Sequence, residues 1–361
     1  MREGLISAAV RQAVEETMRG GQVPGMVVAV ARGHGPAEQL AAGADALGRP
    51  LAEDTLFPVA SVTKPATALA VLRLCDEGVL GLDDPLEHHL PNAAAARPGV
   101  TLRGLLCHTS GLPLDVSGQA APYTHGLDWP TLATACLLTP LEAPPGTRVQ
   151  YSNVGYGLLA LAVERRSGEP FAEALASLVL GPLGLEGYLG AEPPRPPAIL
   201  ANVRSQHSGT DLEPFNSAFW RGLAFPWAGL VTTAAGALAI VRAFHGLPDG
   251  LLRAETRAVA TRDQTGGLDG GFVDPLWWSP CPWGLGPELR GDKSPHWIPA
   301  EAGPDSFGHT GASGCLAWLA PSSGVAWAIL GARTADNGWL LRRGPAIGAA
   351  ILESAQASTN A

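Results

Sequence analysis

Ser61-Val62-Thr63-Lys64, at the head of a long apolar run, is the stretch that decides the fold. Pro65 lacks an N–H and is tolerated in a helix only in the first turn, so the helix is predicted to begin close to Ser61 and to stop at Gly78. Residues 66–72 are apolar on almost every side, which is typical of a helix inside a protein. Ser61 and Lys64, three residues apart, therefore share one side of its first turn.

The cation beside Ser61 is informative. The 24 Lys and Arg residues include only two lysines, Lys64 and Lys293. Arginine cannot release its proton, whereas a lysine desolvated inside a protein can become a neutral amine and accept the proton of a serine hydroxyl. A bare Ser-x-x-Lys also occurs at ordinary solvated helix starts, so this motif alone does not indicate catalysis.

Composition narrows the class of protein. A chain of 361 residues with 46% hydrophobic content can bury one large core or two modest ones. The net charge of −9, without a basic block, argues against nucleic acid and anionic membrane surfaces as partners. No 18 consecutive apolar residues occur, so no membrane span is predicted. We therefore expect a globular protein that acts on small molecules, and its oligomeric state stays open.

The expected compartment is the cytoplasm. Residues 1–19 alternate apolar and charged side chains without a continuous apolar core, which is unlike a signal peptide. The five cysteines have no paired spacing, and free thiols fit a reducing compartment. His-Glu-x-x-His and Cys-x-x-Cys motifs are missing from the sequence, so neither a metal site nor a cofactor is expected.

Hydrophobic periodicity places strands at both ends of the chain and helices in the middle. Helices are expected over 4–19, 102–108, 131–138, 154–166 and 171–180, from the Thr232-Thr233 cap to about 245, and over 343–356; strands are expected over 26–30, 40–45, 283–286, 315–319 and 325–331. Residues 186–225 have little regular pattern and are expected to cover a cleft.

The predicted fold class is α+β, with an antiparallel sheet flanked by N- and C-terminal helices and a mostly helical insertion. We expect residues 1–80 and 226–361 to form a discontinuous sheet-containing domain. Residues 81–225 would form the helical domain with its covering loops, and the cleft would lie between the two.

Two further motifs follow the serine in order. Tyr151-Ser152-Asn153 stands just before a predicted helix, and His309-Thr310-Gly311 precedes a predicted strand. Together with Ser-x-x-Lys, they resemble the three signatures of the serine β-lactamase and penicillin-binding-protein superfamily: Ser-x-x-Lys, Tyr-x-Asn and Lys-Thr-Gly. The resemblance runs from about residue 20 to 335, and the Tyr-x-Asn form points to the class C and esterase branch. It is strengthened by the stretches 57–60, 106–113, 151–158, 228–233 and 307–308.

The resemblance, joined to the chemistry of the side chains, implies a role for each motif. Ser61 would be the acylated nucleophile, Lys64 the amine that takes its proton, and Tyr151 a phenol that passes the proton to the leaving group. Asn153 would hydrogen-bond Lys64 and the substrate. If Ser61 and Lys64 were not in the sequence, Tyr151 would be interpreted as an ordinary buried aromatic residue and Asn153 as a helix cap.

The third motif is expected to bind the substrate. Thr310 and Gly311 would lie along the bound substrate. The backbone N–H groups of Ser61 and Ala312 would form the oxyanion hole. His309 departs from the family pattern, because β-lactamases and transpeptidases carry lysine there. A histidine is mostly neutral at pH 7, so a carboxylate-bearing substrate would lose its fixed cation. This departure is similar to the family's esterases and D-aminopeptidase-like hydrolases.

We therefore expect a carboxylesterase-like serine hydrolase that acts on small esters or amides. The alternatives are a β-lactamase acting on lactams, a D-aminopeptidase or DD-peptidase-like hydrolase, an acyltransferase, and a non-catalytic binding protein of the same fold. Aromatic segments at 219–220, 225–227, 277–278 and 283 either form an apolar wall for uncharged substrates or simply pack the core.

Overall fold

The computed structural model describes residues 4–19, 22–247, 249–272 and 276–360, and the residues outside these ranges all belong to the predicted sheet domain. Its centre is a six-stranded sheet in which every neighbouring pair is antiparallel. In spatial order the strands are β2 (Glu38–Gly43), β1 (Gly25–Arg32), β12 (Val325–Gly331), β11 (Cys315–Ala320), β10 (Phe307–Gly311) and β9 (Glu288–Leu289). The pairing of β1 with β12 joins the N-terminal and C-terminal parts of the sequence in one sheet.

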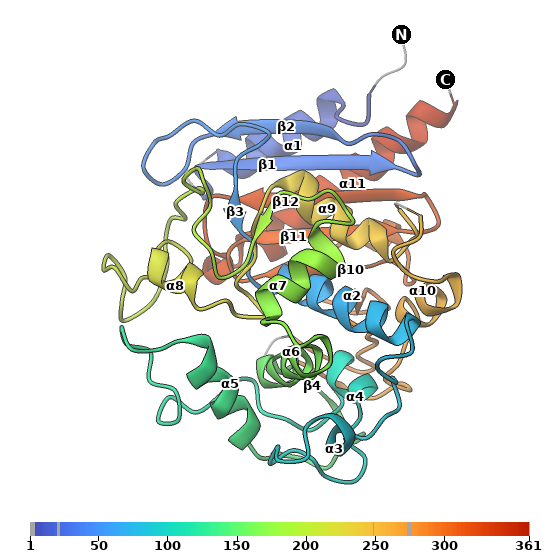
Figure 1. Ribbon diagram of the computed structural model, residues 1–361. Helices are drawn as coiled ribbons and strands as arrows, with labels where there is room; N and C mark the ends of the chain where they lie inside the picture. Colours follow the sequence, from blue (N-terminus) through green and yellow to red (C-terminus); the bar gives the residue numbers. More distant parts are fainter. Residues whose placement is uncertain (1–3, 20–21, 248, 273–275, 361) are drawn as a thin grey trace.

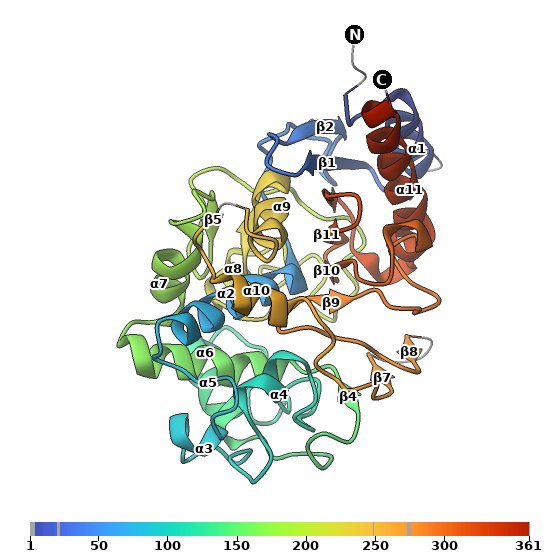
Figure 2. The same ribbon diagram turned by 90° about the vertical axis from the view of Figure 1, so that its right-hand side faces the viewer.

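Helices cover both faces of this sheet, as Figure 2 shows. The terminal helices α1 (Ala8–Met18) and α11 (Trp339–Asn360) pack together on one face, and α2 (Thr63–Asp76) and α9 (Ala234–Ala243) lie on the other. Successive side chains of a strand point to opposite faces, and the core divides accordingly. Val28 belongs to the apolar cluster under α1 and α11, whereas Val27 belongs to the cluster under α2 and α9. These observations confirm the predicted α+β fold.

The middle of the chain is mainly helical, and most of its helices lie below α2 in Figure 1. Its helices are α3 (Leu86–His89), α4 (Leu102–Leu106), α5 (Trp129–Leu138), α6 (Asn153–Ser167), α7 (Phe171–Leu175), the π-helical turn η2 (Ala176–Leu180) and α8 (Ala218–Gly222), and α10 (Ala254–Ala260) follows later. The longest helix of this region, α6, contacts α2, α4, α5 and α7. One apolar cluster continues from the sheet through α2 into α6, and the division into two domains stays a prediction.

Two small sheets connect these parts. The strands are β3 (Phe57–Pro58), β6 (Val231–Thr232) and β5 (Gly187–Tyr188) in one, and β4 (Val149–Gln150), β7 (Gly270–Gly271) and β8 (Trp277–Trp278) in the other. β3 leads directly to Ser61, and β4 leads directly to Tyr151. Among the described residues, no helix is long and apolar enough to cross a membrane.

Several sequence-based predictions need correction. Residues 283–286 do not form a strand; Trp283 makes one isolated bridge to Glu288, and Gly286, at φ 107°, turns the chain before β9 begins. His309-Thr310-Gly311 precedes strand β11, as predicted, but it also lies on a strand of its own, β10, which the sequence did not predict. The first helix begins at Ala8, and the last begins at Trp339.

Candidate active site

Ser61 lies in a short 3₁₀ turn, η1 (Ala60–Val62), between β3 and α2. Ala60, directly before it, has φ 46°, a left-handed conformation that a residue with a Cβ adopts only under constraint. The Thr63 hydroxyl holds this turn, because it donates to the Ala60 carbonyl at 2.7 Å and accepts from the Leu230 N–H at 3.1 Å. Ser61 is half-buried and opens onto a cavity. The turn therefore presents the hydroxyl at a fixed place.

Lys64 is completely buried at the start of α2, and its Nζ has three polar neighbours. They are the Asn153 Oδ1 at 2.6 Å, the Trp227 carbonyl oxygen at 3.2 Å and the Ser61 Oγ at 3.4 Å. Burial holds the pKa of Lys64 well below the usual lysine range, and the more distant Asp115 carboxylate opposes this only in part.

The three contacts of Lys64 are compatible with a neutral amine, and burial is what favours that form over an ammonium ion, which could donate to all three oxygens. The Asn153 and Trp227 oxygens can only accept, so each takes one N–H. A neutral amine has two N–H groups and one lone pair, and the third neighbour, the Ser61 hydroxyl, is a group that can donate. All three contacts are then satisfied with the hydroxyl proton directed at the lysine nitrogen, which is the arrangement that a general base requires.

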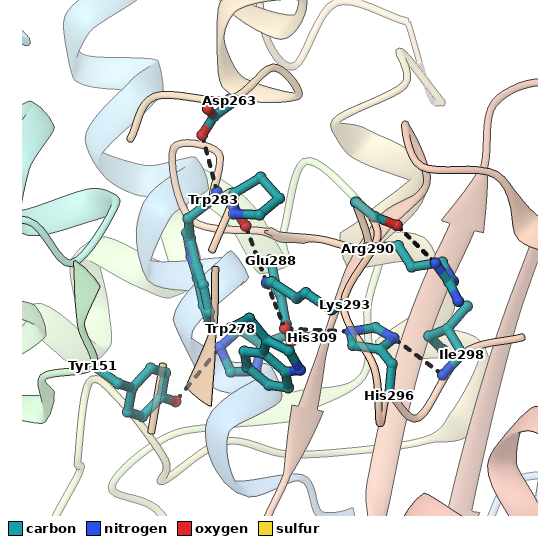
Figure 3. A network of polar contacts seen from close by, with 12 residues as sticks. Tyr151, Asp263, Trp278, Trp283, Glu288, Arg290, Lys293, His296, Ile298 and His309 are labelled. Carbon is teal, nitrogen blue, oxygen red and sulfur yellow. Dashed lines mark hydrogen bonds and ion pairs between the residues drawn. The ribbon is translucent and has the colours of Figure 1, made fainter. Parts of the chain in front are cut away.

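Tyr151 follows β4 and is buried against the rings of His108, Phe272 and Trp283. Burial raises the pKa of its phenol far above the usual range, although the hydroxyl of Ser61 reduces the rise, so the group carries its proton at neutral pH. Its hydroxyl lies 3.5 Å from Nε2 of His309 (Figure 3).

The geometry of His309 assigns its tautomer. Its Nδ1 lies 2.6 Å from the Thr310 carbonyl oxygen, which can only accept, so Nδ1 carries the proton. The neutral ring then leaves Nε2 to accept from Tyr151. Burial, together with the nearby Lys64, lowers the pKa of His309 to about 4. The expectation of a neutral side chain at this position thus agrees with the surroundings of the ring.

Asn153 is the first residue of α6, and Ser152 rather than Asn153 caps that helix. Its Nδ2 donates to Asp115 Oδ1 at 2.7 Å, which orients the amide so that its oxygen faces Lys64. Asp115 is exposed, and the sequence analysis did not single it out. It lies two residues beyond the quoted stretch 106–113, but only the folded chain brings it to Asn153.

The third motif lies directly against the serine turn. A Cβ added to Gly311 would overlap the Val59 carbonyl oxygen and approach the Ser61 nitrogen, so only glycine allows β10 to come this close. Thr310 is buried, and Ala312 reaches the same cavity as Ser61. The structure thus brings all eight of the sequence-predicted residues to one region; their roles in turnover belong to the proposal below.

A cavity of about 340 Å³ opens beside Ser61 and is mainly apolar. The covering segment 186–225 supplies Phe215, Trp220 and Phe225, and Trp227 follows it. Other lining residues are Ala60, Val116, Ala121, Tyr123, Leu127, Leu132, Asn153, Ala228 and Ala312, and Asp115 is the charged residue among the described lining residues. Part of the predicted aromatic wall therefore faces the cavity, while Trp283 lies behind Tyr151 instead.

A buried ionic cluster, which the sequence analysis missed, lies next to Trp283 (Figure 3). Lys293 Nζ lies 2.8 Å from Glu288 Oε1, with both side chains fully buried, and His296 Nε2 lies 3.3 Å from the same oxygen. The ammonium is 5.0 Å from the ring centres of both Trp278 and Trp283. The ring of Trp283 in turn contacts those of Tyr151 and His309.

The family model named Beta-lactamase matches residues 10–349, and the chain belongs to this family. Esterase EstB of Burkholderia gladioli is 39% identical over 217 residues, which cover 53% of each chain. Penicillin-binding protein 4 of Amycolatopsis lactamdurans is 31% identical over 329 residues, covering 85% of this chain and 80% of that protein.

A solved structure of a beta-lactamase from Mycobacterium bovis superposes with a TM-score of 0.68 at 31% identity, covering 95% of this chain and 99% of that one. Several of the matched curated relatives, EstB included, are matched over only about half of their length. These similarities confirm the family that the three motifs predicted.

Proposed function

We propose that the protein is a serine hydrolase that forms an acyl-enzyme on Ser61 and acts as a carboxylesterase-like enzyme on small, uncharged esters or amides. The Lys64 amine takes the proton of Ser61 while Oγ attacks the substrate carbonyl carbon. The backbone N–H groups of Ser61 and Ala312 bind the developing oxyanion. As the bond to the leaving group breaks, Tyr151 donates its proton to it and receives one from Lys64, and water then hydrolyses the acyl-enzyme by the reverse transfers.

One observation carries this proposal: Lys64 is buried without an ion-pair partner among the described residues, and its two accepting neighbours leave the lone pair for Ser61. An arginine or a paired lysine at this place could not act as a base. The esterase and penicillin-binding protein among the relatives support the same class of chemistry.

The preference for uncharged substrates rests on the walls of the cavity. Aromatic and aliphatic side chains surround the space beside Ser61, and its one described charge, Asp115, is negative. His309 is neutral where a carboxylate-binding cation would stand. A carboxylate on the substrate would therefore meet no fixed positive charge and would be repelled by Asp115, so β-lactams and peptides with a free C-terminus should be poor substrates.

A substrate panel tests this function. Values of kcat/KM for p-nitrophenyl acetate, butyrate and octanoate, for nitrocefin and for D-phenylalanine amide should be highest among the esters. Ser61→Ala should abolish all of them, and mass spectrometry of the quenched reaction should find the acyl group on Ser61. A kcat/KM for nitrocefin above that for every ester would overturn the proposed substrate class, and activity retained in Ser61→Ala would overturn the mechanism.

A further inference from the structure

His108 is a completely buried histidine in the loop after α4, and the mechanism above gives it no role. Its backbone has φ 61°, in the left-handed region that residues with a Cβ rarely adopt. Constraints of this kind persist only where the surroundings hold them, and they gather at functional sites. The contacts of His108 show what this conformation achieves.

Two hydrogen bonds tie His108 to the residues on either side of Tyr151. The Ser152 N–H donates to Nδ1 of the His108 ring at 3.1 Å, and the Gln150 N–H donates to the His108 carbonyl oxygen at 2.8 Å. The ring itself lies against the Tyr151 ring, with 4.5 Å between the centroids and 38° between the planes. One residue thus fixes both backbone neighbours and one face of the phenol.

The same contacts define the state of the ring. Because Nδ1 accepts the Ser152 N–H, the proton of the neutral ring is on Nε2, which is buried and has no hydrogen-bond partner among the described residues. Tyr156 and Trp283 pack around the ring at centroid distances of 5.3 Å and 4.9 Å. A buried polar atom left without a partner costs free energy, so the side chain is poorly explained as filling for the core.

We propose that His108 is a positioning residue for Tyr151: its Nδ1 and its carbonyl oxygen hold the chain on both sides of the tyrosine, and its ring sets the plane of the phenol. This inference rests on the proposed function, in which Tyr151 gives a proton to the leaving group. Its consequence is specific. A displaced phenol harms the expulsion of a poor leaving group, which needs the proton, far more than that of p-nitrophenolate, which does not.

The test compares ethyl butyrate, a poor leaving-group ester, with p-nitrophenyl butyrate in wild type, Tyr151→Phe, His108→Leu and His108→Asn. Asparagine is the matched control, since its Oδ1 lies as many bonds from Cα as the histidine Nδ1, accepts the same N–H, and tolerates the left-handed backbone. His108→Leu should lower kcat/KM, which reports formation of the acyl-enzyme and not its hydrolysis, about tenfold or more for the ethyl ester and about threefold or less for the p-nitrophenyl ester. His108→Asn should restore most of the wild-type ratio of the two esters.

The outcomes separate the two proposals. If Tyr151→Phe changes the ratio while His108→Leu leaves it at the wild-type value, the role of His108 is wrong and that of Tyr151 stands. If Tyr151→Phe itself leaves the ratio unchanged, the proposed proton transfer fails, and the inference on His108 fails with it. If His108→Leu does not fold, the ratio of the two esters is compared between His108→Asn and His108→Gly instead. Both residues adopt positive φ, but only asparagine keeps the hydrogen-bond acceptor.

Discussion

The chain's two lysines are both buried and both lie beside aromatic rings, but their partners differ. Lys293 touches the carboxylate of Glu288 at 2.8 Å. Lys64 contacts a hydroxyl, an amide oxygen and a backbone carbonyl, and the described residues give it no ion pair. The first is held as half of a charge pair, whereas burial drives the second toward the neutral amine.

The difference shows how one side-chain type can serve two purposes within one molecule. Burial alone would raise the pKa of Glu288, yet Lys293 and His296 hold it at about 2, so this carboxylate is charged and its partner cation is needed. Around Lys64 the accepting groups stabilise N–H bonds without supplying a full negative charge. The paired lysine supports the wall behind Tyr151, and the unpaired one is chemically available to Ser61.

The largest effect should come from breaking the charge pair. Lys293→Met leaves the buried Glu288 carboxylate with only its contact to His296 and should lower the free energy of unfolding by about 3–5 kcal/mol, measured by urea denaturation. The double variant Lys293→Met/Glu288→Leu removes both charges and should recover most of this loss. A double variant as unstable as Lys293→Met would mean that packing around the lysine stem, not the charge pair, is what matters.

At the other lysine the expected loss is in turnover. Lys64→Arg should be as damaging as Lys64→Ala, at least about a hundredfold in kcat, because arginine keeps the charge but cannot accept the serine proton. Esterase assays at matched folded fraction measure this. An arginine variant with most of the wild-type activity would show that Lys64 acts only as a cation.

Adding a third lysine tests the reading of His309. His309→Lys should raise nitrocefin turnover relative to p-nitrophenyl butyrate by roughly ten- to a hundredfold in kcat/KM, since a desolvated charge-assisted hydrogen bond to the lactam carboxylate contributes about 1.5–3 kcal/mol. The covering segment 186–225 and the cost of burying the new ammonium both act against this gain. An unchanged or smaller ratio would mean that residue 309 is not at the carboxylate-binding position.

The smallest effect concerns the pH profile. The Asp115 carboxylate raises the pKa of Lys64 against the larger lowering by burial, so Asp115→Asn should lower that pKa further. The free amine then forms at lower pH, and the acidic limb of kcat/KM should move to lower pH by less than about one unit, because Asp115 is exposed and screened. Asparagine keeps an acceptor for Asn153. A limb displaced to higher pH would contradict this coupling.

The sequence predicted those helices and strands that a proline or an apolar run marks directly. Pro65 and the apolar run after it located α2, and the apolar run 325–331 gave β12 with its observed bounds. Trp283-Gly284-Leu285-Gly286 has the apolar character of a strand, but its backbone turns at Gly286, which hydrophobicity does not reveal. The division into two domains remains a prediction.

The site residues that belong to a sequence motif were predicted. The contacts that form only when distant loops fold together were missed. The three motifs meet around Ser61, although the catalytic roles assigned to them are still proposals. Asp115 reaches Asn153 from 38 residues away, and His108 contacts Ser152 from 44 residues away. Neither pairing leaves a periodic pattern, because such contacts depend on loop paths rather than on hydrophobic spacing.

The central claim is that Lys64 is the neutral base of Ser61, and the pH dependence of active-site labelling tests it most directly. The rate at which a fluorophosphonate probe labels Ser61, followed by mass spectrometry in wild type and Lys64→Arg, reports on the base. The Ser61 oxygen bonds to phosphorus as fluoride leaves, so no alcohol or amine leaving group has to be protonated. We predict that wild-type labelling rises with pH through a midpoint well below the range in which exposed lysines titrate, and that Lys64→Arg is labelled far more slowly at every pH. Equal labelling of the two proteins, or a wild-type rise only in the alkaline range of ordinary lysines, would contradict the account.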